Sequence, residues 1–307
     1  MALTLLQMKA LFPDPVRQGI VEMMYREGPA LFDRLNFIKH NAMAYPYSQE
    51  VALPGVSFRG LGEEFAATAE GVVNPAVETL AILGGDISTD SIYIAEKGLG
   101  PARSWRLAKK AKAAARFFIK NFFVGSKATT PKGFDGLKIR LGSSLVITNS
   151  TNGALPIWES FVKAQDLLEG ENSGKLLCMN ITTRRNLSFE VSAHALNMGM
   201  YDVGQQLTTF NGSQIFIIGN DEAGAAILPF TETCGSGVGT CGSAYCVRLG
   251  SDVDEEYVQG ISGLAEIIQF IDVGYTGTQY KDVMQMGAGM GLFSGFCASR
   301  IEGILAA

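Results

Sequence analysis

The sequence is poor in charged residues and in histidine. Lysine, arginine, aspartate and glutamate together make up 18% of its 307 residues, below the roughly 25% of an average soluble protein. Hydrophobic residues make up 47%, which is enough to bury a large core. A chain of this size with so few charges is expected to cover part of its surface with other chains. The composition therefore predicts assembly.

A secretory leader and long apolar runs are also missing. The first residues, MALTLLQMKALF, have no basic region followed by a small-residue cleavage site. No apolar run approaches the length that spans a bilayer. The five cysteines are an odd number and are unevenly spread. We therefore expect synthesis in a reducing cytosol and no membrane partner.

Motifs for nucleotide or metal binding are incomplete. The segment Gly237–Gly242 satisfies G-x-G-x-x-G, but a dinucleotide site needs a helix after this loop, and AYCVRLG is typical of a strand. Cys234, Cys241 and Cys246 lack the paired C-x-x-C spacing of a zinc site. The acids between residues 252 and 256 lack the glycine and the distal glutamate of a calcium-binding loop. We predict neither a cofactor nor a metal.

Catalytic constellations are equally weak. A Ser/His/Asp or Cys/His site would have to use His40 or His194, the only histidines, and the sequence has no G-x-S-x-G elbow. Both histidines fit an ordinary structural or surface role better. The sequence therefore predicts that the protein is not an enzyme. A nucleotide-dependent oxidoreductase that uses the glycine loop is the distant alternative.

The longest helix expected from the sequence runs from Pro101 to Val124. Proline suits a first helical turn, and Gly125 suits the end. At 100° per residue the apolar side chains fall on one side, which is expected to face the core. That side holds Leu107, Ala108, Ala111, Ala114, Ala115, Phe118, Ile119 and Phe122. The opposite side is basic and holds Arg106, Lys109, Lys110, Lys112, Arg116 and Lys120.

Charge is segregated along the chain. From Lys97 to Phe134 there are ten lysines or arginines and no acid, although the whole chain has a formal net charge of −5. Residues 41–96 have the opposite bias, with eight acids and one base, Arg59. A basic stripe can be a solvated helix face. The absence of interleaved acids favours instead a surface that meets phosphate or an acidic partner.

The first third of the chain is expected to form structures that must pack against another surface, either of the same subunit or of a neighbour. Residues 1–40 predict one helix, capped by Asp14, and hold too little apolar surface for a domain. Residues 41–96 show short β-prone runs broken by turn residues. The apolar residues over 45–73 are too scattered to enclose a core, so a hairpin there must lie on another surface.

The remaining chain alternates helix and strand signals, which predicts an α/β or α+β body. Helices are expected over 154–169 and over TTRRNLSFEVSAHAL, the latter capped by Thr182 or Thr183. Asn211-Gly212 predicts a hairpin turn. A second hairpin is expected over 265–296, and ASRIEGILA is the last strand. The second hairpin alternates glycine or glutamine with apolar residues, namely Met284, Met286, Ala288, Met290 and Leu292.

Taken in order, these segments resemble the major capsid protein of tailed bacteriophages, whose shell fold encapsulins share. The resemblance covers nearly the whole chain. Its more specific pieces are LPGVSFRGLGE at 53–63, ETLAILGGDISTD at 78–90, FVGSKATTPKGFDGLKIRL at 123–141 and ILPFTET at 227–233. It implies an α+β fold with an N-terminal arm, an extended β-hairpin loop, a peripheral domain with a long spine helix, and an α/β axial domain.

The resemblance also implies domain boundaries. The arm would be residues 1–40 and the extended loop 41–83. A strand near 84–96 and the spine helix over 101–124 would belong to the peripheral domain. The peripheral domain would comprise 84–133 and 259–294, and the axial domain 134–258 and 295–307.

In such shells the extended loop lies across the neighbouring subunit, and the spine helix faces inward. The implied function is the major capsid protein of a double-stranded DNA phage, which self-assembles into the hexamers and pentamers of an icosahedral head. The loop residues expected to contact a neighbour are Tyr47, Leu53, Pro54, Phe58, Arg59, Glu63 and Glu64. The helix residues expected to face DNA are Arg106, Lys109, Lys112, Arg116 and Lys120.

The implied partners are copies of the same chain and double-stranded DNA bound without sequence specificity. A portal, a scaffolding protein and, where the shell carries one, a decoration protein complete the set. The implied location is the virion, after assembly in the host cytoplasm. An encapsulin nanocompartment, which loads protein cargo in place of DNA, is the alternative with the same fold.

Two departures from the family pattern carry expectations of their own. Some relatives weld their shells by an isopeptide bond from a loop lysine to an asparagine of the peripheral hairpin. This chain has no lysine between residues 41 and 96 and no asparagine between 262 and 294, so that bond is expected to be absent. The arm begins close to Met1, so scaffolding is expected from a separate protein or from a segment already removed.

Overall fold

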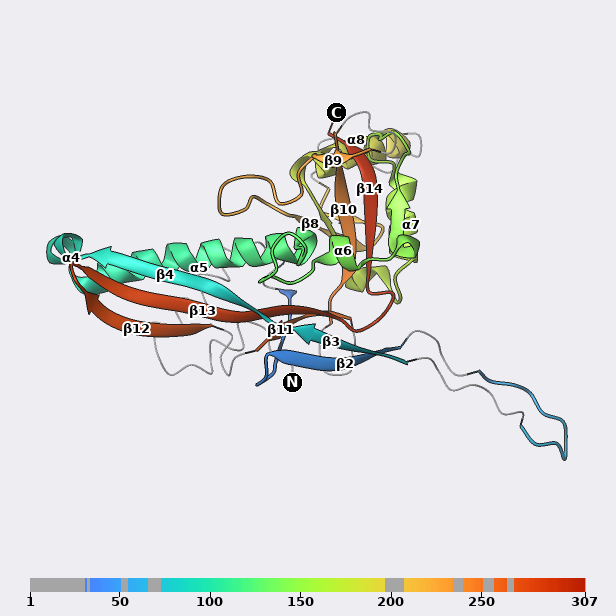
Figure 1. Cartoon of the computed structure of the whole chain (residues 1–307). Helices are drawn as coiled ribbons and strands as arrows, with labels where there is room; N and C mark the ends of the chain where they lie inside the picture. Colours follow the sequence, from blue (N-terminus) through green and yellow to red (C-terminus); the bar gives the residue numbers. More distant parts are fainter. Residues whose placement is uncertain are drawn as a thin grey trace.

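The computed structural model describes Leu31 and residues 34–50, 55–65, 73–196, 207–234, 240–250, 257–263 and 268–306. Within them the chain forms an elongated sheet with one long helix, a compact α/β body beside it, and a hairpin that projects away from both (Figure 1). The fold is therefore α+β, as expected. The predicted arm helix over residues 14–28 lies outside the described residues.

The elongated sheet is built around strand β13 (Gln279–Leu292). One half of β13 lies between β4 (Ala81–Asp90) and β12 (Gln269–Thr276), and the other half pairs with β11 (Val258–Ser262), which pairs in parallel with β1 (Phe37–Lys39). The predicted hairpin over 265–296 is confirmed as β12 and β13. The apolar positions of its second strand are buried, except Leu292, which is half-buried.

The glycine positions of β13 permit close packing on the opposite face of the sheet. A Cβ on Gly289 would collide with the side chain of Leu80, which connects the projecting hairpin to β4. The same leucine also fills the space beside Gly263. Leu80 is itself buried. Glycine is therefore needed where this side chain meets the sheet.

Helix α5 (Leu99–Val124) lies along the sheet (Figure 1). It begins two residues before the predicted start and ends at the predicted Gly125. Of its predicted apolar face, every member but Ala108 is buried. The strand expected over 84–96 is wrong in its second half, because β4 ends at Asp90 and α4 (Ser91–Lys97) follows. Asp90 starts that helix by accepting a hydrogen bond from the backbone N–H of Ile92, at 2.9 Å.

The compact body is a mixed sheet with helices on two faces. Its strand order is β5 (Val146–Thr148), β14 (Ala298–Leu305), β10 (Thr240–Arg248), β6 (Lys175–Met179), β8 (Ser213–Ile217) and β7 (Thr209–Phe210), with β9 (Glu232–Thr233) also paired to β10. Cys178 and Tyr245 face the cluster that contains α5, whereas Leu177 and Ala244 face α7 (Trp158–Asp166) and α8 (Ile181–Leu196). The alternation shows that both faces of this sheet are buried.

The structure confirms some of the local predictions for this body and corrects others. The Asn211-Gly212 turn is confirmed, with φ of 46° and 83°. The helix predicted over 154–169 begins only at Trp158, and FDGL leads into the short helix α6 (Leu137–Arg140). The cap of α8 is Asn180 and not a threonine, because the Asn180 side chain accepts from Thr182 N–H at 3.0 Å.

Cys234 and Cys241 form a disulfide, with their Cα atoms 5.6 Å apart. The odd cysteine count did not predict this bond. Cys178, Cys246 and Cys297 are buried free thiols. Among the described helices, none is both long and apolar enough to cross a membrane.

Candidate functional site

The projecting hairpin consists of β2 (Ala44–Glu50) and β3 (Val73–Thr79), which form a separate two-stranded sheet. Aromatic side chains hold its base against the body. Tyr45 and Tyr47 both pack on Phe293, with ring centroids 6.1 and 5.0 Å apart. Tyr47, predicted to contact a neighbour, therefore lies at the base, and the Tyr47 hydroxyl donates to Glu78 at 3.3 Å. Burial, together with the charge of Glu78, raises the pKa of Tyr47.

An ion pair joins the same base to α6. Arg140 pairs with Glu78, and the two side chains are only 13% and 11% exposed. Arg140 also donates to the carbonyl oxygen of Met290 on β13, at 2.8 Å. Lys127 reaches Thr79 at 3.0 Å. These contacts come from three separate parts of the chain, so the hairpin leaves the body in a defined direction.

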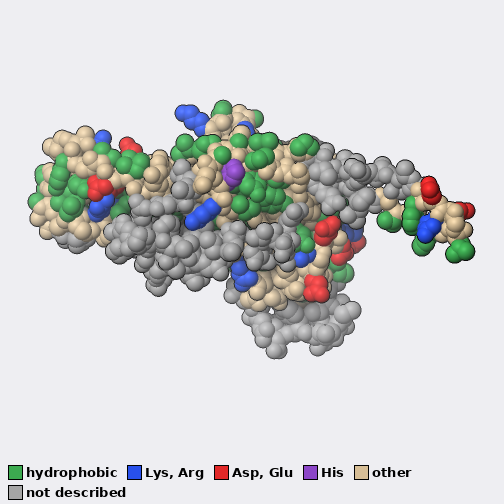
Figure 2. Space-filling model, turned by 90° about the horizontal axis from the view of Figure 1, so that it is seen from below, with side chains coloured by type: hydrophobic (Ala, Val, Ile, Leu, Met, Phe, Trp, Pro, Cys, Tyr) green, Lys and Arg blue, Asp and Glu red, His purple; other side chains and the backbone are tan. Residues whose placement is uncertain are grey.

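The tip of the hairpin segment, residues 55–65, lies far from the body and displays apolar and charged side chains together (Figures 1 and 2). Phe58 and Leu61 are fully exposed, at 106% and 109%. Arg59 donates to the carbonyl oxygen of Glu63 at 2.8 Å, and the Glu63 carboxylate accepts from Gly60 N–H at 2.9 Å. Glu64 is exposed at the same tip. Leu53 and Pro54 lie outside the described residues.

The basic residues predicted to face DNA divide into two groups. Lys109 is exposed and lies over the ring of Trp105, 3.8 Å from its centroid, and Lys112 and Arg116 are half-buried. Arg106 instead donates to the carbonyl oxygen of Ser88 on β4. Lys120 likewise contacts another part of the same chain and not the solvent alone.

Lys120 pairs with Asp221 at 2.8 Å. Asp221 is only 3% exposed and also accepts from the N–H groups of Ala223 and Ala225, so it holds the 219–227 loop against α5. The hydrogen bond from Lys120 lowers the pKa of Asp221, and the same bond raises the pKa of Lys120. Sequence reasoning missed this pair because its members are 101 residues apart. The basic face of α5 is therefore narrower than predicted.

A second ion-pair cluster lies near the start of α5. Arg103 donates two hydrogen bonds to Asp282, at 3.0 and 2.6 Å, and pairs with Asp272 at 3.0 Å. Asp282 is 1% exposed. The two parallel hydrogen bonds attach the N-terminal part of α5 to β13. This arginine belongs to the basic stretch from Lys97 to Phe134, but carboxylates within the chain neutralise its charge.

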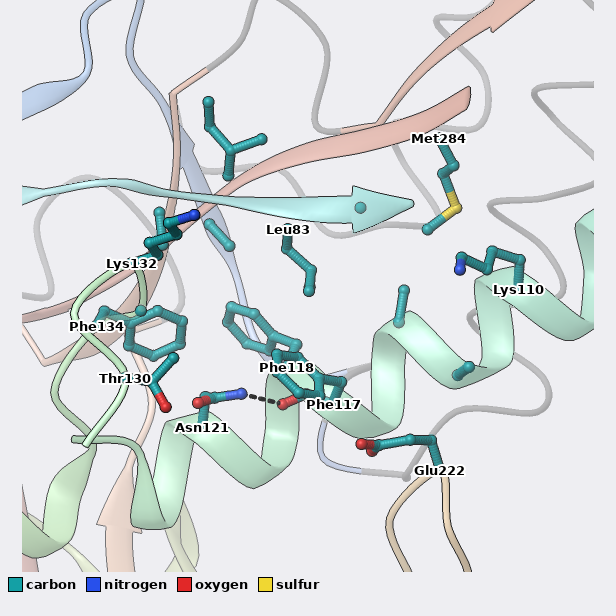
Figure 3. A pocket seen from close by; sticks show the side chains of 17 residues that line it. Leu83, Lys110, Phe117, Phe118, Asn121, Thr130, Lys132, Phe134, Glu222 and Met284 are labelled. Atoms are coloured by element: carbon teal, nitrogen blue, oxygen red, sulfur yellow. Dashed lines mark hydrogen bonds between the residues drawn. The ribbon is translucent and has the colours of Figure 1, made fainter. Parts of the chain in front are cut away.

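A groove of about 370 Å³ lies between β4, α5 and the loop over 130–134. Leu83 and Phe118 line it, and Lys110 and Lys132 stand at opposite sides (Figure 3). Phe117 is part of the same lining and is 37% exposed. The groove is mostly apolar and contains no constellation for catalysis.

A larger polar cavity, of about 640 Å³, lies at the end of the compact body. Glu232 lines it and pairs with Lys138 at 2.7 Å and with Arg300 at 2.8 Å. Ser243 also donates to Glu232. Although burial opposes it, these donors lower the pKa of Glu232. Both cations of the cavity are therefore balanced by carboxylates, since Glu302 stands 3.6 Å from Arg300.

The weak catalytic motifs gain no support. His40 packs edge-on against Tyr45, at 5.0 Å between ring centroids, and the side chain of His194 is not described. Gly237, Gly239 and the acids at 252–256 lie outside the described residues, but strand β10 follows the glycine loop where a dinucleotide site would need a helix. In the described part of the chain, His, Cys, Asp and Glu form no group that could hold a metal ion.

Comparison by sequence finds no matching family model and no matching curated protein. Comparison by structure does find neighbours. The chain is similar to the holo-SrpI encapsulin complex from Synechococcus elongatus PCC 7942, with a TM-score of 0.62 and 11% identity over 93% of this chain and 90% of that one. For the capsid of the native GTA particle the TM-score is 0.61, with 10% identity over 88% of both chains. For Mycobacterium phage Bobi it is 0.60, with 11% identity over 89% and 90%.

Proposed function

We propose that this chain, which has the α+β fold that phage capsid proteins share with encapsulins, is the subunit of a self-assembling protein shell. The observation that carries the proposal is the projecting tip. Phe58 and Leu61 are fully exposed there. Covering such apolar side chains with another chain removes them from water and stabilises the complex. A copy of the same chain is the partner that a closed shell supplies.

More finely, we propose the major capsid protein of a tailed double-stranded DNA phage. Residues 41–83 would be the extended loop that crosses to a neighbour, 84–133 with 259–294 the peripheral domain, and 134–258 with 295–307 the axial domain. Hexamers and pentamers would form the head, with a portal and a separate scaffolding protein. The role would be structural and not enzymatic.

Packaged DNA would meet the solvent-exposed side of α5, which would face the interior of the shell. Lys109 and Arg116 support this part of the proposal, because no ion pair within the described chain neutralises either of them. Contacts of this kind neutralise phosphate without reading sequence. They would therefore suit a genome of any sequence.

An encapsulin-type nanocompartment is the second candidate. It is favoured because the basic face of α5 offers fewer free cations than the sequence predicted. Arg106 and Lys120 are engaged within the chain, which leaves fewer cations for DNA. Mass spectrometry of particle contents separates the two candidates. A phage head would contain genomic DNA, and a nanocompartment would contain a single protein cargo.

Negative-stain electron microscopy of the purified chain tests the shell itself. Closed particles of uniform size are expected. Monomers under every assembly condition would contradict the proposal. Empty particles would not, because the purified chain lacks the proposed portal.

A further inference from the structure

We propose that Cys234 and Cys241 form a redox-active pair that is closed by a small-molecule disulfide, which reaches Cys234 through the polar cavity. The two residues flank residues 235–239, and the pairing of β9 with β10 brings them together: Thr233 is opposite Thr240, and Glu232 is opposite Cys241. Their Cα separation of 5.6 Å lies in the range that a disulfide requires. The backbone therefore positions both thiols for bonding.

On the side of Gly153, the chain packs closely against both sulfur atoms. Gly153, with φ of 80°, lies directly against them, and a Cβ there would stand 2.8 Å from Cys241 Sγ and 2.9 Å from Cys234 Sγ. The turn that contains Gly153 is bound to β14, since Ala154 donates to Gly303 at 3.1 Å and accepts from Leu305 at 2.8 Å. The closed pair thus packs on a fixed surface made by the turn and the last strand.

Access to the pair is unequal. Cys234 belongs to the wall of the 640 Å³ polar cavity, which Thr231, Thr233 and Ser150 also line, whereas Cys241 does not. Both side chains are otherwise buried, at 2% and 1% exposure. A small-molecule disulfide in this cavity would meet the sulfur of Cys234 and not that of Cys241. Exchange is therefore expected to begin at Cys234.

The exchange balances as two substitutions. The Cys234 thiolate attacks one sulfur of the small disulfide, whose S–S bond breaks and releases one thiolate, which takes up a proton. The Cys241 thiolate then attacks the Cys234 sulfur, forming the Cys234–Cys241 bond and releasing the second small thiol. The two cysteines lose two protons and two electrons, and the small disulfide is reduced to two thiols.

The other cysteines of the chain serve as internal controls. Cys178, Cys246 and Cys297 are free and buried. Burial raises the pKa of all three thiols, to about 12 for Cys246 and Cys297. None of the three lines the polar cavity, so the proposed entry route does not lead to them. They should remain alkylatable only after unfolding.

The test uses the reduced full-length chain and oxidised glutathione as the probe. After acid quenching and alkylation, peptide mapping is expected to recover a 234–241 cross-link and three free thiols. Cys241→Ser should accumulate a glutathione adduct on Cys234, whereas Cys234→Ser should accumulate none on Cys241. Absence of the cross-link in the wild-type chain overturns the proposal, and an adduct on Cys241 overturns the entry route.

Peptide mapping of the Cys234–Cys241 cross-link does not depend on shell formation, because it can be done on subunits and on assembled particles. Circular dichroism shows whether each single variant is folded, and the wild-type mapping needs no variant. Reopening by a phosphine should restore both thiols. A failure of particles to form would contradict the proposed function and leave the mapping result intact.

Discussion

Arg140 and Glu78 meet in a mostly buried ion pair at the point where the projecting hairpin leaves the body. The arginine comes from α6 and the glutamate from β3, so the pair joins the hairpin to the compact part of the chain. The direction in which the hairpin leaves the body therefore depends on an ion pair that is largely shielded from water.

Replacing Arg140 by alanine should destabilise the unassembled subunit by about 3 kcal/mol, because the Glu78 carboxylate would stay buried without its partner. Urea unfolding measures the change. Lys163→Ala is the matched control, since it breaks an ion pair with Glu159 in which both side chains are 61% exposed. No measurable change is expected there. Equal losses in the two variants would show that the Arg140 pair is not special.

Replacing Phe58 and Leu61 together by serine should leave subunit stability unchanged and prevent particle assembly. Both side chains are fully exposed in the isolated chain, so their removal costs the fold nothing, whereas a covered side chain of this size is worth about 2 kcal/mol. Thermal melting and sedimentation velocity give the two readouts. Ser57→Ala at the same tip is the control. Normal particles from the double variant would rule out the tip as a contact.

Reversing charge at Lys109 and Arg116 to glutamate should reduce the nucleic acid in particles and leave the fold intact. Lys120→Glu differs, because it would set a second carboxylate against the buried Asp221 and should destabilise the subunit itself. The ratio of nucleic acid to protein in purified particles, together with subunit melting, distinguishes these effects. Unchanged packaging in the Lys109/Arg116 variant would contradict an inward-facing basic helix.

The Lys120–Asp221 pair should make stability depend on pH at both ends of the scale. Lys120 lowers the pKa of Asp221, so that contribution is present above the unfolded value of about 4 and is lost as pH falls through the folded value. The raised pKa of Lys120 gives a contribution present below about pH 10 and lost at higher pH. Unfolding of Asp221→Asn, compared with wild type between pH 2 and 6, should show a flatter curve. Parallel curves would contradict this assignment.

Local patterns were enough to predict the long elements. The 3.6-residue spacing of α5 and the alternation of Met284, Met286 and Met290 in β13 depend only on which side of an element is buried, and the structure confirms both. The Asn211-Gly212 turn is similarly local. The overall arrangement followed from the family resemblance, which rests on sequence pieces from most of the chain.

Contacts between distant segments could not be predicted in this way. Nothing near Lys120 in sequence indicates that it binds Asp221, and nothing near Cys234 shows whether its partner is Cys241 or Cys246. The short helix α4 was read as a strand because Ser91–Lys97 contains β-prone residues, and the Asp90 cap outweighed that preference. Residues 55–65 are exposed, in keeping with apolar residues too scattered to enclose a core, but their contacts with other chains remain a prediction.

Leu80 anchors the hairpin at its connection to β4. Its side chain sits between Gly263 and Gly289, and its backbone N–H donates to Met43 at 2.9 Å, so one residue seats the hairpin base on the elongated sheet. Because the tip lies far from this point (Figure 1), even a slight rotation at Leu80 would displace the tip widely. In the proposed shell, one sequence would thereby reach neighbours that are tilted at different angles, as a closed curved surface built from identical subunits requires.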